Sequence, residues 1–175
     1  SLMKQRADVK AGEVRRACSL LGCEELYFLG FDDAVLLVTE AAVKQVASLV
    51  RQVRPHVILT HFPREGSTNT NAHAIGGQIA LYGVQLAGTV DPGDTNPPHK
   101  VSQVFFFGTG GAPLPRDVWG SEGGFYNDVF IDITDVVKKK LAALDALVSQ
   151  GYGGAYARKR IETSDGAFGN AVRCA

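Results

Sequence analysis

The chain has 175 residues, which is the size of one ordinary domain with a hydrophobic core of its own. Its 18 basic residues are balanced by 18 acidic residues, so no overall charge draws it to nucleic acid or to a membrane surface. No apolar run approaches the roughly 18 residues that span a bilayer, and 45% hydrophobic residues is typical of a soluble globular protein.

The three cysteines, Cys18, Cys23 and Cys174, form no C-x-x-C pair. Cys18 falls on the apolar side of an expected helix, where a free cysteine packs as a small hydrophobe. An odd number of cysteines without framework spacing argues against a structural zinc cluster and predicts a reducing, cytoplasmic setting. The first residues also lack the apolar stretch of a signal peptide.

The chain begins with a helical pattern. Apolar residues at helical spacing predict a helix over residues 8–21, and Gly22 is placed to end it. Residues 26–29 (LYFL) are short, apolar and aromatic, so we expect a buried strand there.

Two further helices flank the next expected strand. Thr39 is placed as the N-cap of one helix, and Pro55 stops that helix. Residues 57–60 (VILT) are apolar enough for a strand that is covered on both faces. The next helix begins near His73 and extends to Leu86.

The second half of the chain continues the alternation. Residues 88–100 are rich in Pro, Gly, Asp and Asn and predict a surface loop. Residues 104–107 (VFFF) and 129–133 (VFIDI) predict strands, and Thr134 or Asp135 is placed to cap a fourth helix.

That fourth helix is expected to end at Gly151. The lysines at 138–140 and the basic residues at 158–160 are expected to form solvated helix faces. Strands that alternate with helices predict an α/β fold, Rossmann-like, with three layers and a mainly parallel sheet. We expect residues 1–175 to form a single domain. A first strand before the opening helix is either absent or not among these residues, and the second case would leave the domain incomplete at its N-terminus.

Residues 54–73 (RPHVILTHFPREGSTNTNAH) are the best candidate for an active site. In open α/β folds, ligands bind beyond the carboxyl ends of the strands, where a polar loop of this kind lies. The loop closes on His73, which at neutral pH offers a nitrogen ligand to a metal ion.

The order of these pieces resembles the LmbE-like, or PIG-L-like, deacetylases. The resemblance rests on GEVRRACSLLG, ELYFLGFDDAVL, RPHVILTHFP, a polar loop that closes on a histidine, an IDIT segment and KKKLAAL. It implies a Rossmann-like α/β fold, a divalent metal ion that is usually zinc, and hydrolysis of an N-acyl group on an amino-sugar-like substrate. It also implies that His73 is the third metal ligand.

The sequence departs from the family at two places. The N-terminal His-Pro-Asp-Asp-Glu motif, which implies two metal ligands and a general base, has no counterpart here. The usual His-Pro-Asp-His loop is replaced by Thr70, Asn71, Ala72 and His73. Ala72 and Thr70 thus lack the side chains that support the ligand and stabilise the oxyanion in the family.

The remaining histidines are weaker candidates. His61 ends its expected strand and is either a polar wall of the pocket or a histidine that hydrogen bonds to the backbone. His56 lies at the opposite end of the same strand, and His99 is expected to be exposed in a proline-rich loop. A lone histidine near a helix start, such as His73, also has a structural explanation.

Four residues are candidates for binding the substrate. Arg64, Asn69 and Asn71 lie in the polar loop, where an arginine fork or an amide can hold a hydroxyl or a carboxylate. Asp32 follows the first expected strand, although a turn-forming role explains it equally well. No catalytic residue is assigned.

Three functions remain open. The first is a zinc-dependent deacetylase that acts on a small-molecule substrate. The second is an LmbE-fold hydratase that adds water to an unsaturated di- or tricarboxylic acid, with Arg64 as a clamp for a carboxylate. The third is a non-catalytic α/β binding module. Nucleic acid and membranes are not expected partners, and the long Gly/Pro loops leave a homo-oligomer possible.

Overall fold

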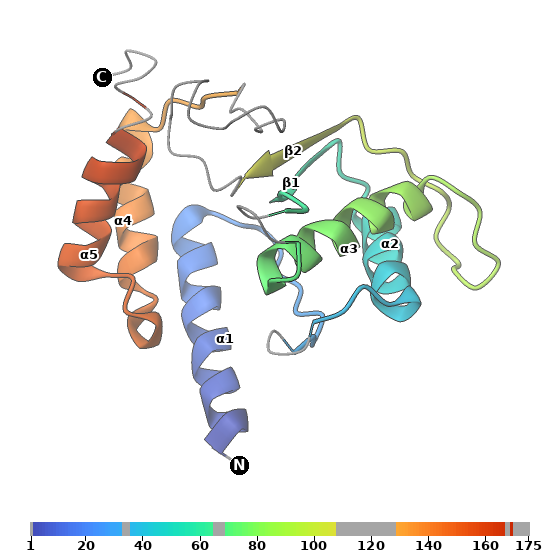
Figure 1. Cartoon of the computed structure of the whole chain (residues 1–175), viewed down its shortest axis with the longest axis horizontal. Coiled ribbons are helices and arrows are strands. Elements are labelled where there is room, and N and C mark those ends of the chain that lie inside the picture. Colours follow the sequence, from blue (N-terminus) through green and yellow to red (C-terminus); the bar gives the residue numbers. More distant parts are fainter. Residues whose placement is uncertain (1, 33–35, 65–68, 108–128, 167–168, 170–175) are drawn as a thin grey trace. The chain divides into compact units, whose positions relative to one another are not determined.

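The computed structural model of the chain describes residues 2–32, 36–64, 69–107, 129–166 and 169 (Figure 1). The helices and strands in these ranges are α1 (Leu2–Leu21), α2 (Glu40–Val53), β1 (Val57–His61), α3 (Ala72–Ala87), β2 (Gln103–Phe107), α4 (Val137–Asp145) and α5 (Gly154–Arg160), with the short elements η2 (Thr134–Val136), η3 (Val148–Gln150) and η4 (Ile161–Asp165). No helix within these ranges is both long and apolar enough to cross a membrane.

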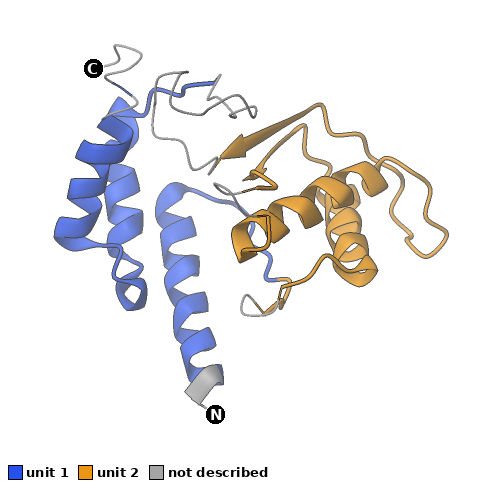
Figure 2. Cartoon of the chain, in the orientation of Figure 1, with its two compact units in different colours: residues 1–28, 112–119, 127–175 blue, residues 29–111, 120–126 orange. Residues whose placement is uncertain are grey.

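The chain divides into two compact units (Figure 2). Unit 1 comprises residues 1–28, 112–119 and 127–175, and unit 2 comprises residues 29–111 and 120–126. The expectation of a single domain stays a prediction.

Unit 2 contains the sheet. β1 and β2 pair in parallel, from Val57 opposite Gln103 to His61 opposite Phe107. α3 lies between the two strands in sequence, so β1, α3 and β2 form a β-α-β unit. This arrangement confirms the predicted α/β fold with parallel strands.

The core of unit 2 lies between its two helices and one face of the sheet. Ala47 and Val50 of α2 pack with Ala87 of α3, and Ile58 of β1 joins this cluster. The helices approach closely because Gly83 has no side chain: a Cβ there would lie 2.5 Å from Cγ1 of Val46. Alternate residues of β1 point away from this core, and Leu59 is 61% exposed.

The ends of α2 follow the sequence signals. The Thr39 hydroxyl accepts a hydrogen bond from the Ala42 backbone N–H at 3.2 Å, which confirms Thr39 as the N-cap. Arg54 ends the helix in the left-handed conformation, with φ 55°, and its N–H donates to the Val50 carbonyl. Pro55 follows directly, as predicted.

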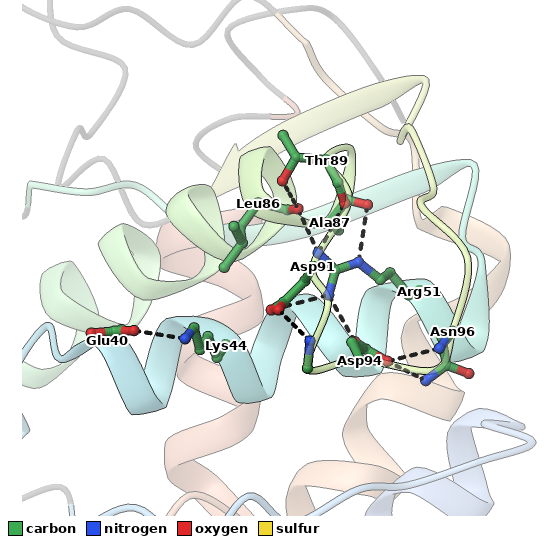
Figure 3. A network of polar contacts seen from close by, with 10 residues as sticks. Glu40, Lys44, Arg51, Leu86, Ala87, Thr89, Asp91, Asp94 and Asn96 are labelled. Atoms are coloured by element: carbon green, nitrogen blue, oxygen red, sulfur yellow. Dashed lines mark hydrogen bonds and ion pairs between the residues drawn. The ribbon is translucent and has the colours of Figure 1, made fainter.

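A buried arginine joins α2 to the end of α3 (Figure 3). Arg51 is only 2% exposed, and its guanidinium donates to the carbonyls of Leu86 at 2.8 Å, Thr89 at 3.1 Å and Ala87 at 3.3 Å. It also pairs with the Asp94 carboxylate at 2.7 Å. The carbonyls at a helix C-terminus have no partner within the helix, so this cation caps α3 from outside.

Unit 1 is helical in its described part. Ala17 of α1 packs against Ala143 and Ala146 of the α4 region, with Leu147 beside them. Glu13 fastens the same helix to η3, because its carboxylate accepts hydrogen bonds from both the N–H and the hydroxyl of Ser149, each at 2.7 Å.

α5 is held to the end of α4 by Asp145. Its carboxylate accepts from Arg158 at 2.5 and 2.8 Å and from the Gly154 N–H at 2.8 Å. The Arg158 guanidinium and the Gly154 N–H both lower the pKa of Asp145, to about 2. The basic residues at 158–160 are exposed, as predicted.

Two predicted strands are wrong. Residues 26–29 and 129–133 are described, and neither segment is paired into a sheet. The Leu29 carbonyl instead accepts from the side chain of Gln45 at 3.2 Å. The Asp132 carboxylate accepts from the N–H and hydroxyl of Thr134, which turns the chain into η2.

The helix boundaries also differ in part from the prediction. α1 begins at Leu2 rather than at residue 8, because the polar residues before the apolar pattern extend the same helix. Thr134 and Asp135 do not cap α4, since the Thr134 hydroxyl is used on Asp132 and the N-cap residue is Val136. α4 ends at Asp145, and Gly151, with φ 69°, ends the following η3.

Candidate functional site

The candidate site lies where β1 ends and α3 begins. His61 is the last residue of β1, and His73 is the second residue of α3. α3 begins there because the side chain of Asn71 accepts a hydrogen bond from the Ala74 N–H at 2.8 Å. The prediction that His73 stands at a helix start after the carboxyl end of a strand is therefore confirmed.

The two histidine rings stack on each other. Their centroids are 4.5 Å apart and their planes are 1° from parallel. Phe107, the register partner of His61 on β2, contacts the His61 ring at a 4.5 Å centroid distance. His73 is exposed, whereas His61 is half-buried. His61 thus lies behind the imidazole of His73, and both of its predicted roles stay predictions.

A glycine allows this contact. Gly77 lies one helical turn after His73, and a Cβ at Gly77 would lie 2.3 Å from the backbone oxygen of His61. Only a residue without a side chain lets the first turns of α3 lie against the end of β1. The glycine pair in the helix interior is the sequence signal for such an approach.

The described residues do not by themselves form a metal site. They contain no group of three His, Cys, Asp or Glu residues that could hold an ion. His61 cannot join His73 on one ion in this geometry, because an imidazole nitrogen binds a metal in the plane of its ring and the two planes are parallel. Among the described residues, His73 is therefore the single candidate ligand here.

The ends of the polar loop are held by a residue that the sequence analysis did not single out. The Gln78 amide of α3 donates to the carbonyls of Pro63 at 3.1 Å and Asn69 at 2.9 Å. These bonds fix both ends of the loop beside the start of α3. An exposed-looking glutamine in a helix carries no signal for this role in the sequence.

The predicted substrate-binding residues occupy different settings. Arg64 and Asn69 are exposed at the two ends of residues 65–68. The Asn71 side-chain oxygen is used as the N-cap of α3, so this residue has a structural role whatever else it binds. Asp32 is exposed in unit 2, outside any helix or strand, and none of these contacts tests its predicted role.

The two remaining histidines are not part of this site. His56 is exposed just before β1, at the end away from His73, as predicted. His99 was expected to be exposed, and this is wrong: it is half-buried, and its Nε2 hydrogen bonds to the Pro55 carbonyl oxygen at 2.7 Å. The bond fastens the 88–100 loop to the turn after α2.

A shallow groove of about 470 Å³ also lies in unit 2, but far from His73. It is lined by Val38, Thr39, Glu40, Val43, Tyr82, Gln85, Leu86 and Thr89. At a rise of about 1.5 Å per residue, the Leu86 end of α3 is roughly 20 Å along the helix from His73. The groove therefore does not belong to the candidate site.

The sequence matches a family model and a curated protein. The family described as GlcNAc-PI de-N-acetylase (PIG-L) matches residues 2–82, a stretch that includes His73. The diacetylchitobiose deacetylase of Thermococcus kodakarensis is 25% identical over 146 residues, which are 79% of this chain and 48% of that protein. The chain thus spans about half the length of this curated relative.

Two solved structures have a similar fold. A conserved protein from Thermus thermophilus superposes with a TM-score of 0.75 and 21% identity, over 94% of this chain and 68% of that one. The N,N'-diacetylchitobiose deacetylase from Pyrococcus horikoshii superposes with a TM-score of 0.65 and 20% identity, over 82% of this chain and 51% of that one.

The fold is therefore α/β of the LmbE-like type, with a parallel strand pair and a histidine at the helix that follows the first of these strands. The sequence is similar to the PIG-L family and to a deacetylase, which supports the LmbE-like, PIG-L-like resemblance that the sequence predicted.

Proposed function

We propose that this chain is part of a metal-dependent hydrolase that removes an N-acyl group, such as acetyl, from an amino-sugar-like substrate. The observation that carries the proposal is the exposed imidazole of His73 at the start of α3, beside the carboxyl end of β1. The match to the PIG-L family over residues 2–82 and the likeness to a diacetylchitobiose deacetylase support it.

Zinc is the metal that we propose, with His73 as one neutral nitrogen ligand. When bound, zinc supplies a water molecule whose pKa is lowered to ~7 and polarises the acyl carbonyl. By the family resemblance, two further ligands and a carboxylate base belong to a His-Pro-Asp-Asp-Glu motif, which this sequence does not contain. The chain's own contribution is an accessible ligand whose ring is backed by His61.

The substrate would lie against the polar loop. Arg64 and Asn69 are exposed at its two ends, and Gln78 holds those ends beside α3. We propose that Arg64 and Asn69, with Asp32 and the amide of Asn71, contact hydroxyl groups of a small-molecule substrate. A cytoplasmic location is a further part of this proposal.

The test uses the natural protein purified from its own source, with its intact mass and its zinc content measured. We expect bound zinc in the wild type and its loss in His73→Ala, with acetate release from an N-acetylated amino sugar lost in parallel. His56→Ala is the matched control, because His56 is exposed at the other end of β1. Equal zinc in the wild type and His73→Ala, or no zinc in either, overturns the metal-dependent function.

The alternative is a hydratase, which the asparagine-containing loop and the exposed Arg64 favour. Such an enzyme adds water to an unsaturated di- or tricarboxylic acid, and Arg64 offers a planar fork of donors to one carboxylate. Loss of conjugated-alkene absorbance without acetate release would identify it. A protein that binds either class of ligand and turns over neither is a non-catalytic binding module.

A further inference from the structure

The C-terminus of α1 places two cysteines against each other. Gly22 has a left-handed backbone, with φ 84°, and its N–H donates to the Ser19 carbonyl at 3.1 Å. The Cys23 N–H donates to the Cys18 carbonyl at 2.9 Å. This pair of bonds around a left-handed glycine is a Schellman motif, in which the side chains at the Cys18 and Cys23 positions meet. In most proteins an apolar pair fills these two positions.

The two thiols differ in exposure. Both are free, Cys18 is half-buried and Cys23 is exposed. Burial, followed by the charge and the hydrogen bond of Cys23, raises the pKa of the Cys18 thiol. An oxidant in solution therefore reaches Cys23 first, because Cys18 is less exposed and its raised pKa favours the protonated thiol.

We propose that Cys18 and Cys23 form a redox-sensitive modification site, which a low-molecular-weight disulfide such as oxidised glutathione converts into an intramolecular disulfide. The two backbone hydrogen bonds of the Schellman motif hold Cys18 and Cys23 close together. A disulfide needs Cα atoms within about 7 Å and facing Cβ atoms, which this motif favours. The inference is independent of the proposed hydrolase function.

The chemistry requires two exchange steps. The Cys23 thiolate attacks one sulfur of oxidised glutathione, which gives a mixed disulfide and releases one glutathione thiolate. Cys18 then loses its proton to solvent, and its sulfur attacks the Cys23 sulfur and releases the second glutathione. The protein dithiol is oxidised to a disulfide, and one glutathione disulfide is reduced to two thiols.

The disulfide would change the segment that follows α1. The backbone there turns at Gly22 and continues to Phe28, whose ring lies 5.0 Å from the Arg15 guanidinium. In the reduced form, two backbone hydrogen bonds define the turn. A covalent bond across the turn locks the last turn of α1 to this segment, where helix ends otherwise fray.

The experiment follows disulfide formation in the full chain. All variants carry Cys174→Ser, so Cys18 and Cys23 are the remaining thiols. The protein is equilibrated with reduced and oxidised glutathione and analysed by intact mass and peptide mapping. We expect the mass to fall by two hydrogen atoms and peptide mapping to find a Cys18–Cys23 bond. In the folded protein, this bond should form at a glutathione ratio at least about tenfold more reducing than the ratio at which it forms in urea.

Two glycine variants test whether the turn geometry is responsible. Gly22→Ala places an L residue at φ 84° with ordinary contacts around the new Cβ, so it opposes the turn without creating a severe clash. Gly12→Ala, in the open middle of α1, is the matched control. In Gly22→Ala, we expect the disulfide to form at nearly the same glutathione ratio in the folded protein as in urea. Gly12→Ala should keep the difference between these two ratios.

Three results overturn the proposal. One is a bond that forms no more readily in the folded chain than in urea. Another is a folded chain that accumulates only mixed disulfides with glutathione. The third is a Gly22→Ala variant that folds, by circular dichroism, and forms the bond as readily as Gly12→Ala. Cys18→Ser and Cys23→Ser must each abolish the intramolecular product.

Discussion

The His61 and His73 rings lie face to face, with centroids 4.5 Å apart and planes 1° from parallel. The residues come from the end of a strand and the start of the next helix, and Gly77 lets that helix approach the His61 carbonyl. If His73 were to hold a metal ion, His61 would be stacked on its ring rather than be a second ligand. The packing of α3 on β1 therefore sets the orientation of the candidate ligand.

Substituting Gly77 tests this packing. The Cβ of Gly77→Ala would lie 2.3 Å from the His61 backbone oxygen, and backbone cannot move aside as a flexible side chain can. We expect the free energy of unfolding to fall by about 1–3 kcal/mol, as for other overpacked sites. Urea unfolding followed by circular dichroism measures it.

Gly76→Ala is the matched control, because nothing lies within 4 Å of a Cβ at that position. Alanine is the better helix former, so this variant should gain about 0.5–1 kcal/mol. If the two neighbouring substitutions change stability by the same amount, the close approach of α3 to His61 is wrong.

Asn71 offers a way to separate a structural role from substrate binding. Its side-chain oxygen caps α3, so Asn71→Ala should lower the free energy of unfolding by about 1 kcal/mol. Asn71→Ser keeps a capping oxygen and removes the amide, and it should restore most of the stability. The measurement is urea unfolding of the variants beside substrate affinity.

Asn69→Ala serves as the control for stability. Gln78 binds the backbone carbonyl of Asn69 rather than its side chain, so this substitution should leave stability nearly unchanged. A weaker substrate affinity in Asn71→Ser at full stability would assign the amide to binding. Unchanged affinity in that variant would leave Asn71 with its capping role alone.

Local signals in the sequence predicted the helices of unit 2 well. Thr39 before an apolar pattern and Pro55 after it define α2, and both act through bonds within a few residues. Strand formation is different, because a strand exists only when another strand pairs with it. Residues 26–29 and 129–133 have strand composition, but no described strand pairs with either segment. The composition of a segment does not show whether another strand lies beside it in the fold.

The candidate site was predicted only in outline. The position of His73 followed from the loop, the helix start and the family resemblance. The stacking of His61 on it depends on a close helix–strand contact that the interior glycine Gly77 permits. The role of Gln78 could not be predicted from the sequence. Its side chain holds the loop because folding brings the carbonyl groups of Pro63 and Asn69 next to it.

Arg51 shows the same limit in the core of unit 2 (Figure 3). The apolar pattern of α2 gives no reason to bury an arginine, and only the fold brings three carbonyls and Asp94 to it. Arg51→Met should lower the free energy of unfolding by about 3 kcal/mol, because buried polar groups lose their partner. Urea unfolding measures the change.

Lys44→Met is the control for Arg51→Met. Lys44 lies on the same helix and pairs with Glu40 at 2.7 Å, but both side chains are largely exposed. Water screens such a pair and replaces it on removal, so we expect little change in stability. Equal losses in the two variants would show that burial does not distinguish the two ion pairs.

The acid stability of unit 2 should depend on Asp94. Hydrogen bonds from Asn96, and then the ion pair with Arg51, lower the pKa of Asp94 from its ordinary 3.8 to about 2. Between these two values the unfolded chain binds more protons at this group than the folded chain does. Asp94 therefore contributes stability in full above about pH 4, and the contribution is lost as the pH falls through about 2.

Asp94→Asn should be less stable than the wild type at neutral pH, and the difference should shrink as the pH falls from about 4 to about 2. Urea unfolding across this range measures it, and carboxyl chemical shifts report the pKa of Asp94 directly. Part of the acid sensitivity remains in the variant, because the pKa of Asp145 in unit 1 is also about 2. A constant difference between the two proteins across the range, or an Asp94 that titrates near 3.8, would contradict the role assigned to the Arg51 network.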